Sequence, residues 1–212
     1  MSDYFMPAKN GTHEMTVDKS RFICHVYRVR TVEEATMYIN EIRDLHTRAT
    51  HHCVAYLIGE DNAFGRADDD GEPSGTAGAP MLEVLQRQNM RNCLVIVTRY
   101  FGGIKLGAGG LIRAYGTAVS EGLKSTGLVR RIKVRSVWLE CDYALFDRLK
   151  NKIKSQGHAV GQVTYSDRVK LEALVAVTDI SPFCKWAGEF VNGTITIDVG
   201  ETFFKDFPYD HE

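Results

Sequence analysis

The stretch Cys93–Leu123, CLVIVTRYFGGIKLGAGGLIRAYGTAVSEGL, holds three successive patterns that decide the fold of the first half of this 212-residue chain. Cys93–Val97 is a continuous apolar run with the length and β-branched content of a buried strand. Glycines follow it, and from Leu111 onward the apolar residues recur at helical spacing until Gly127, which stands where a helix C-cap would. The stretch therefore predicts a strand, a glycine-rich loop and a helix.

The glycine-rich loop supplies the first candidate binding residues, because five glycines among the nine residues 102–110 exceed what one turn needs. Glycine accepts dihedral angles forbidden to other residues and lets a backbone approach a ligand closely. Backbone amides at the start of the helix, with cations nearby, would form an anion site. The candidates for nucleic-acid or anion binding are Arg99, Tyr100, Phe101, Gly102, Gly103, Lys105, Gly107, Gly109, Gly110 and Arg113.

Two nucleotide-binding fingerprints are incomplete in this loop. Gly102 and Gly107 have P-loop spacing, but Ala108 stands where that motif needs its lysine. Gly107 and Gly109 precede a helix, but Ile112 occupies the position of the third glycine of a dinucleotide-binding fold. A generic anion site remains, and the alternative is that the glycines only permit a tight turn from strand to helix.

An acidic segment, Asp68–Pro80 (DDDGEPSGTAGAP), is too rich in acid, glycine and proline to be anything but a loop. Its carboxylates would suit Mg²⁺ or Ca²⁺, but the EF-hand spacing is absent, so we predict neither a metal site nor a cofactor. Gly71–Gly75 does not match the GxSxG nucleophile elbow, and we predict no catalytic residue. We expect this loop to flank the glycine loop and hold its cations in place, with the flanking residues His51, Asp69, Asp70, Glu72 and Ser74.

The run His51-His52-Cys53 has the residue types of a zinc site. Adjacent strand residues point to opposite faces, however, so at most two of the three could converge on one ion. We therefore predict no zinc site, and we expect His51 to line the sheet surface beside the glycine loop.

The formal net charge of −1 conceals a strong local asymmetry. From Arg99 to Arg135 eight bases stand against one acid, whereas from Glu60 to Glu72 six acids stand against one base. A partner responds to local charge within a Debye length. Cations interleaved with aromatic rings suit RNA, since they pair with phosphates and stack on bases. The alternative is that the rings belong to the core and that the later cations form a solvated linker.

The sequence predicts a cytoplasmic protein without membrane contact. No apolar run reaches the roughly 18 residues that a membrane-spanning helix needs. The first 15 residues, MSDYFMPAKNGTHEM, lack the charged start and apolar core of a signal peptide. The five cysteines lie far apart among apolar neighbours, which favours buried free thiols in a reducing compartment.

Outward from the central stretch, the first region is predicted to be α+β. Residues 1 to about 15 have no clear period and are predicted to be a loose arm. A capping box at Thr31–Glu34 starts one helix, and a short helix carries Met81 and Leu85. Further strands are predicted at Arg21–Val29, His52–Ile58 and Ala63–Ala67.

The second region follows a predicted break at Leu128–Lys133. Between Val134 and Val199 the patterns run strand, helix, strand, strand, helix, strand, which is the βαββαβ order of a ferredoxin-like fold. That fold hosts many functions and constrains function weakly. We place the two predicted domains at residues 1–128 and 134–212.

Five runs of the chain strongly resemble the YigZ/IMPACT family. They cover most of residues 17–123, and in the second run the family more often has asparagine at the position of His52. The runs are KSRF (Lys19–Phe22), ATHHC (Ala49–Cys53), DDGEPSGTAG (Asp69–Gly78), PMLEVL (Pro80–Leu85) and RYFGGIKLGAGGLIRAYG (Arg99–Gly116).

The resemblance implies two domains. The first would be similar to the second domain of a small-subunit ribosomal protein and to domain IV of elongation factor G, and the second to the ferredoxin-like domain V of that factor. Eukaryotic relatives carry an additional N-terminal RWD domain and regulate translation by competing for a ribosome-associated activator of a starvation-response kinase. Only about 16 residues precede the matching region here, so we expect neither that domain nor that inhibition.

Three functions follow as hypotheses. The favoured one is a non-enzymatic protein that binds RNA or the ribosome and modulates translation. The second is a magnesium-dependent enzyme or binding protein for a phosphorylated small molecule, with Asp70 or Glu72 holding the magnesium ion. The third is a protein-interaction module in which the ferredoxin-like half binds a protein partner.

Overall fold

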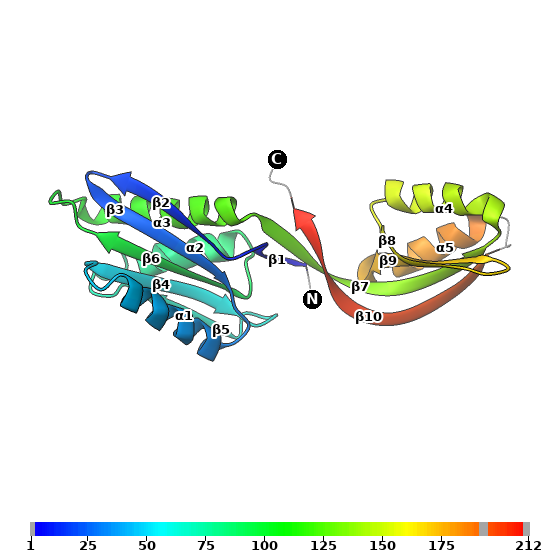
Figure 1. Ribbon diagram of the computed structural model, residues 1–212, viewed down its shortest axis with the longest axis horizontal. Helices are drawn as coiled ribbons and strands as arrows, with labels where there is room; N and C mark the ends of the chain where they lie inside the picture. The colour runs from blue at the N-terminus through cyan, green and yellow to red at the C-terminus, as the bar shows by residue number, and fades with distance from the viewer. Residues whose placement is uncertain (1–2, 191–194, 210–212) are drawn as a thin grey trace. The chain divides into compact units, whose positions relative to one another are not determined.

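The computed structural model describes residues 3–190 and 195–209 of the chain (Figure 1). They form two compact units, Asp3–Arg131 with the chain end from Phe207, and Ile132–Asp206. Both units combine helices with a largely antiparallel sheet.

The first unit is built on a five-stranded sheet with the order β2-β3-β6-β4-β5. Neighbouring strands are antiparallel throughout. The central strand, β6, is the predicted apolar run, and all of its residues except the last are buried. The strands are β2 (Gly11–Val17), β3 (Ser20–Arg28), β4 (His51–Ile58), β5 (Phe64–Asp68) and β6 (Cys93–Tyr100).

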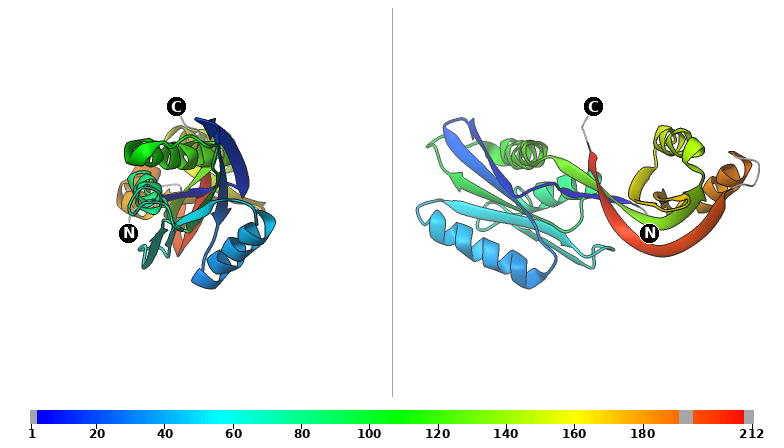
Figure 2. Two further views of the ribbon diagram at one scale, coloured as in Figure 1. Left: turned by 90° about the vertical axis from the view of Figure 1, so that its left-hand side faces the viewer. Right: turned by 45° about the vertical axis from the view of Figure 1, so that its right-hand side comes forward.

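Helices cover both faces of this sheet, as the two views of Figure 2 show. Alternate residues of β6 face opposite ways, so Val95 and Val97 pack under two helices while Leu94 and Ile96 pack under the third. The pair on one face is α2 (Gly78–Arg87) and α3 (Gly107–Thr126), and α1 (Val32–Leu45) covers the other face.

Helix ends follow the predicted signals. The Thr31 hydroxyl accepts a hydrogen bond from the Glu34 amide at the start of α1, and the Glu34 carboxylate accepts one from the Arg30 amide. Gly127 follows the end of α3 with a φ of 66°, a left-handed value that favours glycine.

The expectation of a loose N-terminal arm is wrong. Residues Tyr4–Pro7 form β1, and Gly11–Val17 form β2, an edge strand paired with β3. The tight turn between β2 and β3 places Asp18 and Lys19 at φ values of 44° and 63°. Hairpin turns with two positive φ values usually contain glycine or asparagine, so this turn gave no sequence signal.

The two units divide after Arg131, within the predicted break at Leu128–Lys133, but these residues are not a linker, because they begin the long strand β7 (Leu128–Cys141). Leu128–Arg131 pair in antiparallel register with Pro7–Tyr4 of β1. The cluster of bases that suggested a solvated linker lies along a strand, where Arg130 forms an ion pair with Asp3.

The second unit has the predicted ferredoxin-like arrangement. In the sheet, β10 pairs with β7, which pairs with β9, which pairs with β8, so the order is that of a split βαβ fold. Apolar residues of β7 and β9 pack against the two helices. The remaining elements are α4 (Tyr143–Ser155), β8 (Ala159–Tyr165), β9 (Val169–Ala176), a 3₁₀ turn (Val177–Asp179), α5 (Ile180–Phe190) and β10 (Thr196–Tyr209).

The five thiols are free, and four of them, at Cys24, Cys53, Cys93 and Cys141, are buried. Burial raises the pKa of Cys24 and of Cys53 to about 12, so neither is a reactive thiolate near neutral pH. Within residues 3–190 and 195–209, no helix combines the length and apolar character that crossing a membrane requires.

Candidate functional site

Strand register brings the acidic loop and the glycine loop to the same end of the first sheet. In the antiparallel pair β4–β6, His51 lies opposite Arg99. The Glu72 carboxylate accepts hydrogen bonds from Arg99 Nη1 (2.6 Å) and from the Tyr115 hydroxyl of α3 (2.7 Å). One acidic side chain thus ties together the acidic loop, β6 and α3.

This ion pair is buried. The side chains of Arg99 and Glu72 are 6% and 3% exposed. Arg99 Nη2 also donates to Ser20 Oγ (3.3 Å), and the guanidinium lies 5.4 Å from the ring centre of Phe22. Arg99 is therefore not an exposed cation, because its charge is neutralised inside the fold. A phosphate contact of Arg99 stays a prediction.

Asp69 stabilises the backbone of the acidic loop. Its carboxylate accepts hydrogen bonds from the amides of Gly75 (2.8 Å), Ala77 (3.0 Å) and Gly78 (2.8 Å), at the start of α2. Burial opposes ionisation of Asp69, but these three donors outweigh it and hold the pKa of the carboxyl below its usual value.

Asp70 and His51 connect the acidic loop to α1 and β4. The Asp70 carboxylate accepts from the His52 amide (2.6 Å) and pairs with Arg43 Nη2 (3.0 Å). His51 Nδ1 donates to the Asp70 carbonyl (2.8 Å), and its Nε2 lies 3.8 Å from a Glu72 oxygen. Asp69, Asp70 and Glu72 are therefore committed to internal partners. Ser74, by contrast, is exposed at the tip of the loop.

The residues that sequence placed in one glycine loop divide between a loop and a helix. Helix α3 begins at Gly107, so Gly107, Gly109 and Gly110 form its first turn. Gly102 has a packing role, because a Cβ there would lie 2.0 Å from the Lys19 backbone in the neighbouring turn. Gly103 has a φ of 85° and, among the described atoms, nothing within 4 Å of its Cβ position.

The start of α3 is positively charged and open. Leu106 occupies the N-cap position, and within the described chain α3 has neither a side-chain cap bond nor an acid in its first turn. The first amides of an α-helix have no acceptor within the helix, and those of α3 have no side-chain cap either. Lys105 is exposed beside them, and a guanidinium nitrogen of exposed Arg113 lies 3.6 Å from the Cβ position of Gly109, so this side chain folds back over the first turn.

The two aromatic residues predicted to bind RNA, Tyr100 and Phe101, lie in different surroundings. The Tyr100 hydroxyl is hydrogen-bonded to His46 Nδ1 (2.9 Å) on the α1 side of the sheet. Phe101 is 47% exposed, and two apolar residues that sequence analysis did not single out, Ile104 and Ile112, are 43% and 44% exposed. We call the exposed surface the glycine face, made of Phe101, Gly103, Ile104, Lys105, Gly107, Gly109, Ile112 and Arg113.

Histidines occupy the opposite face of the sheet. The rings of His25 and His46 lie 5.3 Å apart, and burial, reinforced by His46 and His52, lowers the pKa of His25 to about 4. His52 is on this face, whereas Cys53 packs on the other and donates to the Asp69 carbonyl (3.1 Å). In the described part of the chain, no three His, Cys, Asp or Glu side chains converge as metal ligands would.

The fold and site define a class of two-domain α+β protein, with a glycine-rich strand-to-helix junction followed by a ferredoxin-like domain. Sequence comparison gives two family matches, the Impact N-terminal domain over residues 18–123 and a domain of unknown function, DUF1949, over residues 139–194. The chain belongs to the IMPACT family, as the resemblance predicted.

Two bacterial relatives match along most of both chains. The chain is 44% identical over 211 residues to the IMPACT family member YvyE of Bacillus subtilis, covering 100% of this chain and 97% of that protein. It is 32% identical over 202 residues to YigZ of Escherichia coli, covering 93% and 98%. A solved structure described as that of a hypothetical protein matches with a TM-score of 0.59 and 31% identity, covering 93% of this chain and 97% of the other.

Proposed function

We propose that this protein is a cytoplasmic, translation-associated regulator that binds RNA, including ribosomal RNA, through the glycine face. The observation that carries the proposal is the open start of α3, where amides without a side-chain cap, Lys105 and Arg113 lie together. The neighbouring cation, Arg99, is already neutralised by Glu72, so the exposed charge is available for an external anion.

Phosphate is the anion that this arrangement suits best. A helix start carries about half a positive elementary charge, and its first amides point outward as hydrogen-bond donors. Arg113 adds a planar fork that can pair with two phosphate oxygens, and Lys105 adds a compact point charge. Exposed Phe101 adds a ring on which an unpaired base can stack.

Membership of the IMPACT family supports a role in translation. The resemblance of the two domains to domains IV and V of elongation factor G points the same way, since that factor acts on the ribosome. Binding measured separately with ribosomes and with isolated structured RNA identifies the class of RNA.

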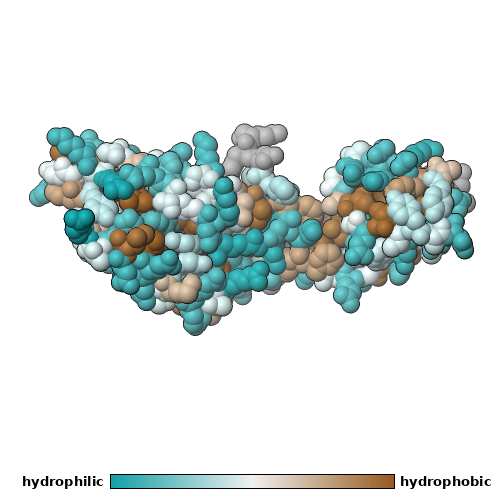
Figure 3. All heavy atoms as spheres, viewed as in Figure 1, coloured by the Kyte–Doolittle hydropathy of each residue, from teal (hydrophilic) through white to brown (hydrophobic). Residues whose placement is uncertain are grey.

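The phosphorylated small molecule is the weaker alternative. Asp70 and Glu72, which were to hold magnesium, are occupied by Arg43, Arg99 and a backbone amide. The third hypothesis, in which the ferredoxin-like half binds a protein partner, stays a prediction. The face of the first unit seen in Figure 3 is mostly hydrophilic with only separate apolar areas, so it adds no apolar docking surface on that face.

The test compares two single charge reversals, one just before α3 and one in its last turn. Lys105→Glu changes the glycine face, and Lys124→Glu changes an exposed residue in the last turn of α3 by the same charge. We expect Lys105→Glu to weaken binding to a structured RNA and to lower the slope of log affinity against log salt by about 0.7 to 0.9, because one phosphate contact is lost. Ribosome sedimentation should follow the same order.

Equal slopes for the two variants would overturn the assignment of the glycine face. Absence of RNA and ribosome binding by the unaltered chain at low salt would overturn the proposed function. In that case, thermal shift measurements with nucleotides and sugar phosphates, with and without Mg²⁺, test the small-molecule alternative.

A further inference from the structure

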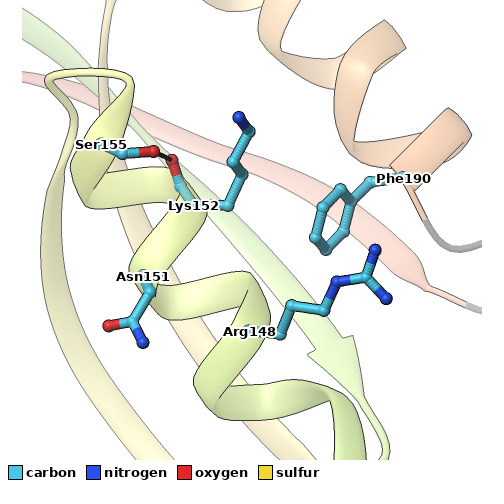
Figure 4. Close-up of a pocket in the computed structure, with 5 residues that line it drawn as sticks. All are labelled: Arg148, Asn151, Lys152, Ser155 and Phe190. Carbon is cyan, nitrogen blue, oxygen red and sulfur yellow. Dashed lines mark hydrogen bonds between the residues drawn. The ribbon is translucent and has the colours of Figure 1, made fainter.

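The second unit contains a groove between its two helices that the proposed function does not use. It has a volume of about 510 Å³ and is lined by Arg148, Asn151, Lys152 and Ser155 of α4 and by Phe190 at the end of α5. Figure 4 shows the Arg148 and Lys152 side chains extending from α4 toward the Phe190 ring.

The groove is basic and partly aromatic. Arg148 and Lys152 are separated by one helical turn and are both exposed, and the Arg148 guanidinium lies 5.0 Å from the ring centre of Phe190. Ser155 Oγ donates to the Lys152 carbonyl (2.9 Å). Of the described residues that line the groove, none is acidic, so an anionic ligand meets attraction along its whole length.

The charge of α4 explains why a polyanion would choose this side of the unit. Helix α4 carries four bases against one acid, Asp147, and two of these bases, Arg148 and Lys152, share the side of the helix that lines the groove. Lys150 and Lys154 lie on other sides of the helix. A chain of phosphates gains from the Arg148–Lys152 pair because each cation it neutralises releases condensed counterions.

The opposite face of the sheet in the second unit carries both an acidic and a basic side chain, Glu172 and Lys170. Glu172 lies there, and its carboxylate accepts from Ser136 Oγ (2.6 Å) and from the Gln162 amide (3.1 Å), where β8 has a bulge. Lys170 covers the ring of Trp138 at 5.1 Å, so this ring is already in contact with a cation. Because Glu172 is negative and Lys170 is already in contact with a ring, this face attracts an anion less than the groove does.

We propose that the groove binds single-stranded RNA as a second contact site of this protein. Arg148 and Lys152 pair with neighbouring phosphates, and a base stacks on the outer face of the Arg148–Phe190 pair. Asn151 supplies donors and an acceptor for the edge of that base. This inference rests on the proposed function and adds the second unit to it.

The experiment uses the full chain and a labelled single-stranded oligoribonucleotide, with fluorescence anisotropy measured over a salt series. The double variant Arg148→Glu/Lys152→Glu removes both groove cations. Lys154→Glu/Lys185→Glu is the matched control, since both residues are exposed on the same two helices but do not line the groove. Circular dichroism verifies that each variant is folded.

We expect the groove double variant to lower affinity about 25-fold at 0.1 M salt and the salt slope by about 1.4, because each single-strand phosphate contact contributes about 0.7 to the slope. Phe190→Leu should lower affinity about 5-fold or more with the slope unchanged, because stacking is not ionic. Arg148→Lys, which keeps the charge and loses the planar group, should resemble Phe190→Leu.

Two results separate this inference from the proposed function. If the groove variant binds like its control while Lys105→Glu weakens binding, the groove is not an RNA site and the glycine face stands. If the groove variant weakens binding while Lys105→Glu and Lys124→Glu behave alike, the groove is supported as an RNA site and the glycine face is not. An unaltered chain that binds no RNA at low salt contradicts both.

Discussion

The buried Glu72–Arg99 pair and the exposed Lys105 and Arg113 lie around one strand-to-helix connection, but their charges serve different purposes. Arg99 lies near the end of the buried strand β6, points toward the side covered by α2 and α3, and is neutralised by Glu72 inside the fold. Lys105, in the loop after β6, and Arg113, in α3, are exposed. The comparison teaches that side-chain direction on a strand or helix, rather than residue type, decides whether a cation holds the fold or meets a ligand.

The largest expected effect is on the buried side of this comparison. Glu72→Gln leaves the Arg99 guanidinium buried without its counter-charge, and we expect a loss of about 3–5 kcal/mol in the free energy of unfolding. Glu14→Gln is the control, because its partner Arg21 at 2.7 Å is half exposed and such pairs are worth at most about 1 kcal/mol. Chemical denaturation measures both, and equal losses would contradict a structural role for Arg99.

The next effect concerns pH and the histidine side of the sheet. Because the pKa of His25 falls to about 4 in the fold, the unfolded chain takes up a proton first as pH falls below the ordinary value of 6.5. Stability is therefore full above about pH 6.5 and is lost toward pH 4, by roughly 3 kcal/mol for this group.

Denaturation curves between pH 7 and pH 4.5 measure this loss. We expect His25→Gln to flatten the dependence, whereas His13→Gln on the neighbouring strand β2 retains it. A dependence that is as steep in His25→Gln as in the unaltered chain would show that other groups cause it.

A smaller effect on stability is expected to differ between Gly102, which has backbone atoms against it, and Gly109, which has space for a side chain. Gly102→Ala places a methyl group 2.0 Å from the Lys19 backbone, and we expect it to cost about 1–3 kcal/mol. Gly109→Ala has helical geometry and only the mobile Arg113 side chain at 3.6 Å, so we expect a gain of up to about 1 kcal/mol. Thermal unfolding of the two variants compares them, and a destabilised Gly109→Ala would mean that its backbone is constrained.

Sequence patterns predicted the elements whose signals are local. The apolar run Cys93–Val97 predicted β6, Thr31 with Glu34 predicted the start of α1, and Gly127 predicted the end of α3. The ferredoxin-like order of the second unit followed in the same way. Each of these signals depends on residues that are close together in the chain.

Sequence patterns did not predict the features that depend on residues far apart in the chain. Arg99 reads as an exposed cation until Glu72, 27 residues earlier, is seen to fold onto it. β1 pairs with Leu128–Arg131, more than 120 residues away, and no periodicity can reveal such a partner. The commitment of Asp69 and Asp70 to backbone amides likewise depends on the path of a loop.

The measurement that tests the central claim most directly is a titration of ¹⁵N-labelled protein with a structured RNA, followed by amide NMR. We expect the amide signals of Gly103, Lys105, Gly107 and Gly109 to shift first and furthest, because the amides at the start of α3, which have no side-chain cap, meet phosphate. Shifts confined to the α1 side of the sheet, around His46 and His52, with the glycine face unchanged, would contradict it.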